Sequence, residues 1–448
     1  MDLREYLQRI DASDQLSIVK AGVDPRLELA ALCRREFSKH RGGNALLFAQ
    51  VSDSPFPVVA NLFGSEPRAS LLLHSDSLHH FSEKLQKLLE QQTGTVTEMF
   101  QFAEKNKDPF QLEETELQFV PDLKLTSLPA IQSWPGERGR YLNLSMALTQ
   151  HPETGLRNLG LYRAQIIDSN RLAVNFSLNS GAAEHLSVAA KSAKSLPISL
   201  ILGSDPALLW LAAAPLPVGC DEFAFCRALF NSEMKLTSGL SQPLAVPMDA
   251  EIIIEGQISP GDTVLEGPFG NHTGQYVSRL DCPVMQVSAI RLRPEPIFPT
   301  TVVGPPPSEN IYLARANKIL LREMLKIDYP QISDLHMPME TIFHGVALLA
   351  IKQQSTGDNK ELLYSLWEKS PLRSSRLLVL LYEDINVSSA SSSWWRTINC
   401  LKNRRIYQDN GRIAIDATGV DPSSLVVEDR QTTELLQRRR GDTNYARW

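Results

Sequence analysis

The sequence is poor in several features that define large classes of proteins. Its five cysteines are scattered and form no CxxC pair, so neither a disulfide framework nor a thiolate zinc site is expected. The 45 Lys and Arg residues are outnumbered by 51 Asp and Glu residues, for a net charge of −6. This balance leaves no basic excess for a nucleic-acid partner.

Long apolar runs are also missing. The most apolar stretch, residues 207–218, is broken by prolines and falls short of the ~20 residues that span a bilayer. The first residues, MDLREYLQRIDASDQ, are charged from the second position and lack the apolar core of a signal peptide. We therefore predict a cytoplasmic chain without a membrane span.

What remains is a globular composition, with 43% hydrophobic residues over 448 positions, and a length typical of about three domains. Residues 1–112 alternate helical and strand-like patterns, residues 113–308 are mostly extended and punctuated by prolines, and residues 309–448 alternate again. The last alternation predicts a doubly wound sheet with right-handed crossovers. We expect an N-terminal α/β domain, a β-rich middle domain, and a helix followed by a C-terminal α/β domain.

Four short segments in or beside the middle section carry polar or glycine residues where a plain strand or helix would not. They are NLGLYR (158–163), LNSGAAEH (178–185), PLPVGCDEF (215–223) and EGPFGNHTGQY (266–276). In the last of these, Glu266 precedes what we predict to be a rigid turn, in which two glycines allow a ligand close to the backbone. Spacing alone leaves open a simple hairpin turn with a solvated glutamate.

Together with GSDPA (203–207), VVGPPPSEN (302–310), EDIN (383–386) and IAIDAT (413–418), these segments resemble the UbiD family of decarboxylases along nearly the whole chain. The resemblance implies a central split β-barrel related to flavin reductases between two α/β domains. It also implies a homo-oligomer, either a dimer or a hexamer.

The family resemblance implies decarboxylation of an aromatic or α,β-unsaturated carboxylic acid with prenylated flavin mononucleotide, supplied by a flavin prenyltransferase. A polyprenyl-hydroxybenzoate of quinone biosynthesis, such as the ubiquinone pathway, is one such substrate. The cofactor supplies the difficult electronics, and the protein binds, orients and moves protons. By motif, Arg163 corresponds to the residue that meets the substrate carboxylate, and Glu266 to its neighbouring carboxylate. The same pair is also an ordinary structural ion pair in many proteins.

Two sets of residues are implied for the cofactor. Asn158, Asn179 and Glu222 correspond to ligands of a divalent metal, usually Mn²⁺ with K⁺ as a further ion, that holds the flavin phosphate. Hard cations suit amide, carboxylate and phosphate oxygens. The residues implied to line the flavin itself are Leu161, Tyr162, Arg163, Asn175, Phe176, Ser177, Ser180 and Gly181.

The chain departs from the family pattern at the position of the proton donor. Five residues after Glu266 the family has an acid, and this chain has Asn271. An amide does not exchange a proton near neutral pH, and loss of a positioned general acid removes roughly 10²–10⁴-fold of rate. The neighbouring His272 titrates in the right range to serve instead.

A second departure lies where the ubiquinone branch reads R-W-x-x-H-R-G-G. This chain reads NFSLNSGA from residue 175 to 182, so two arginines and a histidine are missing, with Asn179 in the place of the imidazole. The losses remove bidentate partners for an anion. Two hypotheses follow: a decarboxylase with an altered site, or a non-catalytic homologue that serves as a binding or assembly subunit.

Overall fold

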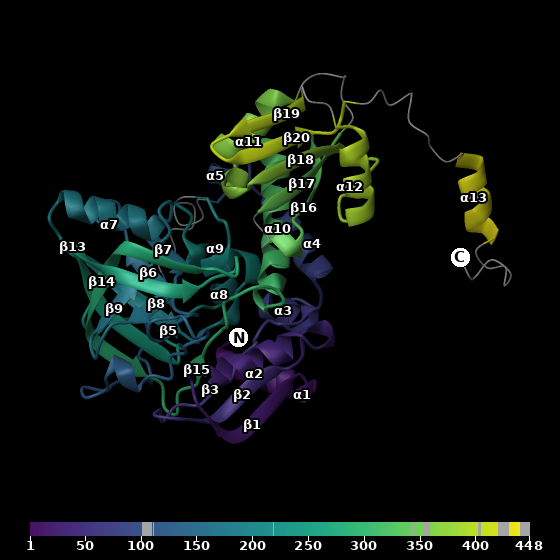
Figure 1. Ribbon diagram of the computed structural model, residues 1–448. Helices are drawn as coiled ribbons and strands as arrows, with labels where there is room; N and C mark the ends of the chain where they lie inside the picture. Colours follow the sequence, from purple (N-terminus) through teal and green to yellow (C-terminus); the bar gives the residue numbers. More distant parts are fainter. Residues whose placement is uncertain are drawn as a thin grey trace. The chain divides into compact units, whose positions relative to one another are not determined.

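The structure is a computed structural model that describes residues 1–100, 110, 112–217, 219–341, 345–352, 359–401, 405–419 and 430–439. The chain forms two compact units (Figure 1). One comprises residues 1–330 with 338–343, and the other comprises residues 331–337 with 344–448. The predicted boundaries at 112/113 and 308/309 remain predictions, because these units do not test them.

The first unit begins with a small mixed sheet. Strands β1 and β2 run parallel, β3 is antiparallel to β2, and β15 adds in parallel to β3 from a segment more than 200 residues further along. The four strands are β1 (Leu16–Val23), β2 (Ala45–Val51), β3 (Val58–Ala60) and β15 (Phe298–Pro299). Because β15 comes from the far end of the middle section, the N-terminal sheet is completed by a strand of that section.

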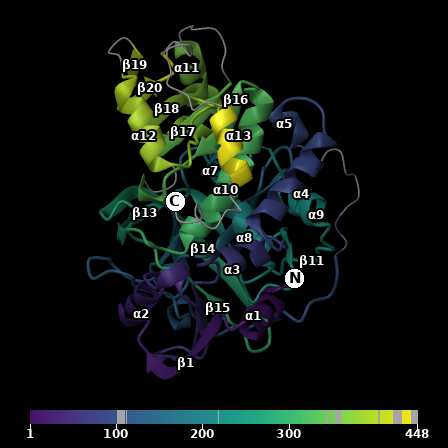
Figure 2. The ribbon, with the colours of Figure 1, turned by 90° about the vertical axis from the view of Figure 1, so that its right-hand side faces the viewer.

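Helices accompany this sheet in the first unit. Side-chain caps fix several starts; for example, the Ser77 hydroxyl accepts from the backbone N–H of His80 at the start of α4, which satisfies a donor that the helix itself leaves open. Helix α10 packs against α3, α4 and α5 (Figure 2). The helices are α1 (Leu3–Ala12), α2 (Glu28–Phe37), α3 (Glu66–Leu72), α4 (Leu78–Glu90), α5 (Val96–Met99) and α10 (Asn310–Asp328).

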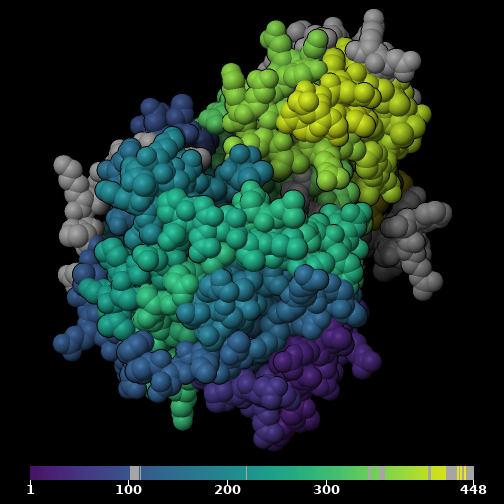
Figure 3. Space-filling model, turned by 60° about the vertical axis from the view of Figure 1, so that its left-hand side comes forward, coloured from purple at the N-terminus to yellow at the C-terminus, as the bar shows by residue number. Residues whose placement is uncertain are grey.

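A curled antiparallel sheet of nine strands forms the β-rich middle section. Its order is β5-β8-β9-β14-β13-β10-β6-β7, with β4 paired to β14 off this path. The strands are β4 (Gln118–Phe119), β5 (Tyr141–Leu142), β6 (Met146–Gln150), β7 (Arg157–Leu161), β8 (Ala164–Ile166), β9 (Arg171–Val174), β10 (Leu196–Leu202), β13 (Ile252–Gly270) and β14 (Tyr276–Leu292). In the space-filling view this section forms a continuous teal and green surface beside the purple N-terminal residues (Figure 3).

Three helices and a small hairpin complete the first unit. Helix α7 packs over β6, β7, β10 and β13, and α8 and α9 pack against each other and against β7. They are α7 (Gly181–Lys191), α8 (Pro206–Ala213) and α9 (Glu222–Phe230), with the hairpin strands β11 (Leu236–Ser238) and β12 (Ala245–Pro247). Asp221 caps α9 by accepting from the backbone N–H groups of Phe223 and Ala224, so the residue that follows, Glu222, is held at the first turn.

The second unit contains a five-stranded sheet with the order β16-β17-β18-β20-β19. The three central strands are parallel, and both edge strands are antiparallel. The elements are β16 (Ile332–His336), β17 (Val346–Ile351), α11 (Lys360–Lys369), β18 (Leu377–Tyr382), α12 (Ala390–Asn399), β19 (Ile406–Asp409), β20 (Arg412–Asp416) and α13 (Arg430–Arg438). The predicted strand-helix alternation is confirmed, but the two antiparallel edges were not foreseen.

One prediction about the middle section is wrong. The segment Glu266–Gly270 is the last part of strand β13 and not a turn; the chain reverses at residues 271–275. Gly267 has a φ of +96°, a conformation open to glycine, and the register of β13 against β14 shifts on both sides of Glu266. A glycine and a proline therefore mark an irregular strand at this place.

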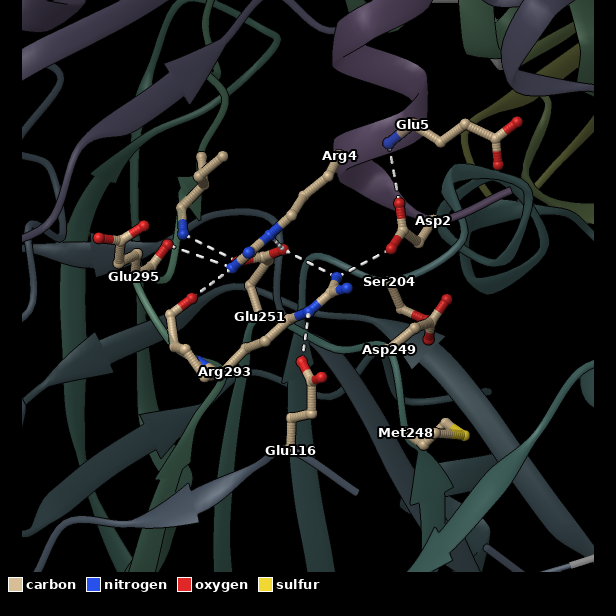
Figure 4. A network of polar contacts seen from close by, with 12 residues as sticks. Asp2, Arg4, Glu5, Glu116, Ser204, Met248, Asp249, Glu251, Arg293 and Glu295 are labelled. Atoms are coloured by element: carbon tan, nitrogen blue, oxygen red, sulfur yellow. Dashed lines mark hydrogen bonds and ion pairs between the residues drawn. The ribbon is translucent and has the colours of Figure 1, made fainter. Parts of the chain in front are cut away.

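A polar network ties helix α1 to the end of strand β14 (Figure 4). Glu251 is fully buried and accepts two hydrogen bonds from Arg4, at 2.8 and 2.9 Å, and one from Arg293 at 3.4 Å. The nearby Asp249 accepts a hydrogen bond of 2.6 Å from the Ser204 hydroxyl. Burial raises the pKa of the Asp249 carboxyl to about 6.

Candidate active site

The hairpin of β8 and β9 brings two of the predicted segments together. Residues 158–163 lead into β8, and residues 175–181 follow β9 directly. The backbone N–H of Asn175 donates to the carbonyl of Arg163 at 3.1 Å. Side chains from both segments consequently meet on the sheet beside the irregular end of β13.

Arg163 and Glu266 form a bidentate ion pair. Arg163 Nε donates to Glu266 Oε1 and Nη2 donates to Oε2, both at 2.8 Å. The glutamate side chain is fully buried, whereas 23% of the arginine side chain stays exposed. The guanidinium also lies over the Phe269 ring, 4.4 Å from its centroid. Such a planar, forked cation suits a second carboxylate as well as the one it already holds.

A further amide and a further guanidinium extend this pair. Asn175 Nδ2 donates to Glu266 Oε2 at 2.8 Å. Arg279 Nη1 donates to the carbonyl of Phe176 at 2.6 Å and reaches Asn175 Oδ1 at 3.4 Å. Arg163, Asn175, Glu266 and Arg279 are called the arginine cluster below.

Buried groups surround the arginine cluster. The Glu137 carboxylate accepts from the backbone N–H groups of Ser133, Trp134 and Gly270, while burial raises its pKa and the charge of Arg163 lowers it. Cys282 is fully buried, and burial, reinforced by the Glu266 charge, raises the pKa of its thiol to about 12. The Cys282 thiol therefore keeps its proton at neutral pH.

A second group of predicted residues lies around Asn158 and Glu222. Glu222 Oε2 accepts from the backbone N–H of Leu159 at 2.9 Å, and burial raises the pKa of the Glu222 carboxyl to about 8. The Tyr162 hydroxyl interacts with Ser180 and Asn158. Asn158 lies so close to Gly181 that a Cβ at that glycine would stand 2.2 Å from Asn158 Oδ1. Asn158, Tyr162, Ser180, Gly181 and Glu222 are called the glutamate cradle below.

The donor set of the cradle fits a hard divalent cation that takes further ligands from a phosphate and water. Asn158 Oδ1 is the atom that would bind the cation, whereas the buried Asn158 Nδ2, which has no acceptor among the described residues, suits a phosphate oxygen. A cation beside Glu222 would also stabilise the ionised carboxylate that burial disfavours. Within the described part of the chain, no three His, Cys, Asp or Glu side chains gather as a metal site.

The third implied metal ligand is placed differently. Asn179 is exposed in the turn before α7, as is Ser177. Of the other residues implied for the flavin, Phe176 is 2% exposed and stacks edge-on against Tyr162, with ring centroids 5.0 Å apart. Leu161 is half-buried against the core. Ser180 also caps α7 by accepting from Ala183.

The Asn271 side chain stabilises the hairpin turn between β13 and β14. Its Oδ1 accepts from the backbone N–H of Thr273 at 2.9 Å and from the Thr273 hydroxyl at 2.6 Å. This short-range pattern is a turn that Asn and Asp both form well. His272 follows it, half-buried in the same turn.

Sequence reasoning missed three residues beside the site: Glu137, Arg279 and Cys282. Arg279 could have been found from the sequence, because it follows the turn at residues 271–275 by nearly as many residues as Glu266 precedes it. The register shifts between β13 and β14 hid the pairing, since they cannot be counted from the sequence.

Comparisons with known proteins identify the family and the fold. Three family models match in order: the N-terminal domain of 3-octaprenyl-4-hydroxybenzoate carboxy-lyase at residues 7–88, its Rift-related domain at 103–306 and its C-terminal domain at 311–417. Uncharacterized proteins of Archaeoglobus fulgidus and Aquifex aeolicus are each 32% identical over 400 and 409 residues, which is 88% of this chain and 83% of each relative.

Solved structures share the fold. Vanillic acid decarboxylase of Sedimentibacter hydroxybenzoicus, in its closed form, matches with a TM-score of 0.83 at 23% identity over 98% of both chains. An evolved dimeric form of the UbiD-class enzyme HmfF of Pelotomaculum thermopropionicum, in complex with prenylated FMN, matches with a TM-score of 0.80 at 23% identity over 97% of this chain and 98% of that one. The matched family models describe one class of proteins, the carboxy-lyases. Within it, the chain belongs to the UbiD family. No helix among the described residues has the length and apolarity to cross a bilayer.

Proposed function

We propose that the protein is a carboxy-lyase that decarboxylates an aromatic or α,β-unsaturated carboxylic acid. The observation that carries the proposal is the Arg163–Glu266 pair, in which a buried carboxylate holds a guanidinium whose remaining face is partly exposed. A cation held in this way is pre-organised for an anionic substrate. A polyprenyl-hydroxybenzoate is one candidate substrate, and smaller aromatic acids, like those named for the structural neighbours, are others.

Prenylated FMN and a divalent cation, with Mn²⁺ as the first candidate, complete the proposed site. Asn158 and Glu222 would hold the cation and, through it, the flavin phosphate, while Arg163 would face the reacting end of the substrate. When bound, the cofactor would supply the electron sink that the loss of CO2 requires. A flavin prenyltransferase would supply it, and a homo-oligomer is the proposed assembly.

The chain's own part in the reaction is to bind and orient the acid and to allow a proton to replace CO2. Glu266 keeps Arg163 in place for the carboxylate. Asn271 cannot donate a proton, so the proton would come from His272 or from water at the hairpin turn.

The test is co-expression with a flavin prenyltransferase, followed by ultraviolet–visible spectroscopy, native mass spectrometry and an assay of CO2 release from a panel of aromatic and acrylic acids. In D2O the product should carry deuterium at the carbon that lost CO2. The matched variants are Arg163→Met, which should abolish release, and Arg171→Met, which removes an exposed arginine of the same sheet and should not. A cofactor-loaded protein that releases no CO2 from any acid would refute the proposal.

A second candidate function is that of a non-catalytic binding or assembly subunit. Two observations favour it: Asn271 is committed to its turn, and Asn179 is exposed rather than buried in the cradle. Under this alternative, Glu266→Gln would leave the cellular role of the protein intact.

A further inference from the structure

Arg279 lies opposite Glu266 because strand β14 contains an extra residue at this place. Val264 pairs with Cys282, but Glu266 pairs with Arg279 instead of Leu280. Such bulges redirect side chains and occur often beside active sites. Leu280 is 82% exposed, whereas only 22% of the Arg279 side chain is exposed. The bulge thus turns the arginine inward and the leucine outward.

The contacts of Arg279 fix the orientation of an amide. Asn175 Oδ1 faces Arg279 Nη1 at 3.4 Å, and Asn175 Nδ2 faces Glu266 Oε2 at 2.8 Å. A donor on one side and an acceptor on the other permit only one of the two amide orientations. Arg279 itself is anchored by its 2.6 Å hydrogen bond to the Phe176 carbonyl, so the amide cannot easily turn away.

The amide in turn acts on the ion pair. Glu266 is fully buried; both of its oxygens accept from Arg163, and Oε2 also accepts from Asn175. Loss of the amide contact would leave one lone-pair direction of a buried carboxylate unmet, which is costly and loosens the bidentate geometry. Arg279 also makes the arginine cluster net positive, because the cluster holds two guanidinium groups and one carboxylate. The other partner of Arg279, Asp281, is 79% exposed and is screened by solvent.

We propose that Arg279 is a positioning residue for substrate binding: through Asn175 it fixes Glu266, and with it the Arg163 guanidinium that meets the substrate carboxylate. The family pattern has an arginine at position 175 itself; here a guanidinium reaches that place from strand β14. This inference rests on the proposed function and deepens it.

The first test needs no activity. Urea midpoints are measured for the wild type, Arg279→Met, Glu266→Gln and the double variant. If Arg279 acts on Glu266, the midpoint loss caused by Arg279→Met should be at least halved in the Glu266→Gln background. Equal losses in both backgrounds would overturn the proposal.

The second test measures the binding of benzoate, an unreactive carboxylate, to the cofactor-loaded protein by calorimetry. Arg279→Met should weaken binding about tenfold, Arg279→Lys should weaken it less, and Asp281→Asn should change it less than twofold. Asn175→Ala combined with Arg279→Met should be no weaker than the worse single variant, because the two residues act in series. Unchanged affinity in Arg279→Met, or additive losses in the double variant, would contradict the positioning role.

The two proposals fail in different ways. If the wild type binds benzoate but releases no CO2 from any acid, the proposed function is refuted and the positioning of Arg163 by Arg279 survives. If Arg279→Met binds and turns over like the wild type while the wild type is active, the proposed function stands and this inference is overturned.

Discussion

The arginine cluster and the glutamate cradle treat a buried glutamate in opposite ways. Glu266 receives three side-chain hydrogen bonds, two of them from a guanidinium. Glu222 receives a backbone hydrogen bond, and burial raises its pKa to about 8, while the adjacent Arg157 is engaged by Asp221. The countercharge of Glu266 comes from the protein, whereas burial favours the protonated form of Glu222, for which the proposed countercharge is a bound cation.

The same contrast occurs away from the site, in the network of Figure 4. Glu251 is bound by two arginines, whereas Asp249 is bound by a serine hydroxyl and has a raised pKa. A buried acid with a forked cation stabilises the structure that holds it. A buried acid without one remains costly until something binds it.

Removal of Arg163 should have the largest effect. Arg163→Met leaves Glu266 buried without its cation, which we expect to lower the free energy of unfolding by about 3–5 kcal/mol and kcat/KM by roughly 10³-fold. Urea unfolding and CO2 release measure the two quantities. The control Arg171→Met breaks an exposed ion pair with Asp168 and should cost less than about 1 kcal/mol. Similar losses for both variants would contradict the special status of Arg163.

Changes at two neighbouring acids should sharpen the comparison. Glu222→Gln should reduce bound cofactor and metal to less than about a tenth, because the amide is a poorer cation ligand, without lowering the stability of the cofactor-free protein. Asp221→Asn should do the reverse: it removes the charge that pairs with Arg157, which costs about 1–2 kcal/mol, but it keeps an oxygen that caps α9 and should retain cofactor. Native mass spectrometry and urea unfolding separate the two outcomes.

Restoration of an acid at position 271 should have a smaller effect in the opposite direction. Asn271→Asp keeps the acceptor for Thr273 and adds a group that exchanges protons, so CO2 release and deuterium incorporation should rise roughly 10–100-fold. Asn271→Ser preserves a turn-forming side chain without the acid and should not accelerate either rate. If Asn271→Asp has no effect, proton delivery does not limit the reaction.

The smallest effect should be the pH dependence that Asp249 causes. Its pKa in the folded state is about 6, above the usual 3.8, so the folded state holds the proton more tightly. Stability should therefore fall as the pH rises from about 4 to 6 and stay lower above that window. Asp249→Asn should flatten this curve and be more stable at pH 7 by about 1–2 kcal/mol. Asp281→Asn, at an exposed acid, should leave the curve unchanged.

Much of the fold could be predicted from local patterns. Caps, prolines and apolar runs are local signals that predict helices at 77–92 and 205–213 and strands at 45–51 and 377–383. Helices α4 and α8 and strands β2 and β18 lie within a few residues of these ranges. Strand β15 could not be foreseen, since two residues become a strand only when β3 lies beside them. The end of β13 looks like a turn in the sequence, because a Gly-Pro pair occurs in turns and also in irregular strands such as this one.

The site shows the same division. Motifs indicated Arg163, Glu266, Asn158 and Glu222, and the structure places these residues in two groups. Arg279 escaped, because its partner is set by a bulge that has no signature in composition. The roles of these residues stay proposals until the variants above are measured.

The bulge opposite Glu266 also bears on how this enzyme class diversifies. A one-to-one pairing that continued from Val264 and Cys282 without the bulge would place Leu280 opposite Glu266 and turn Arg279 to the other face, since the side chains of a strand alternate between its faces. Homologues that have lost the bulge through a single deletion in this hairpin would then carry an apolar side chain in place of a cation beside the same glutamate. Length variation in one ribbon, and not only substitution in the pocket, is thus a route by which evolution could retune which acids such a protein accepts.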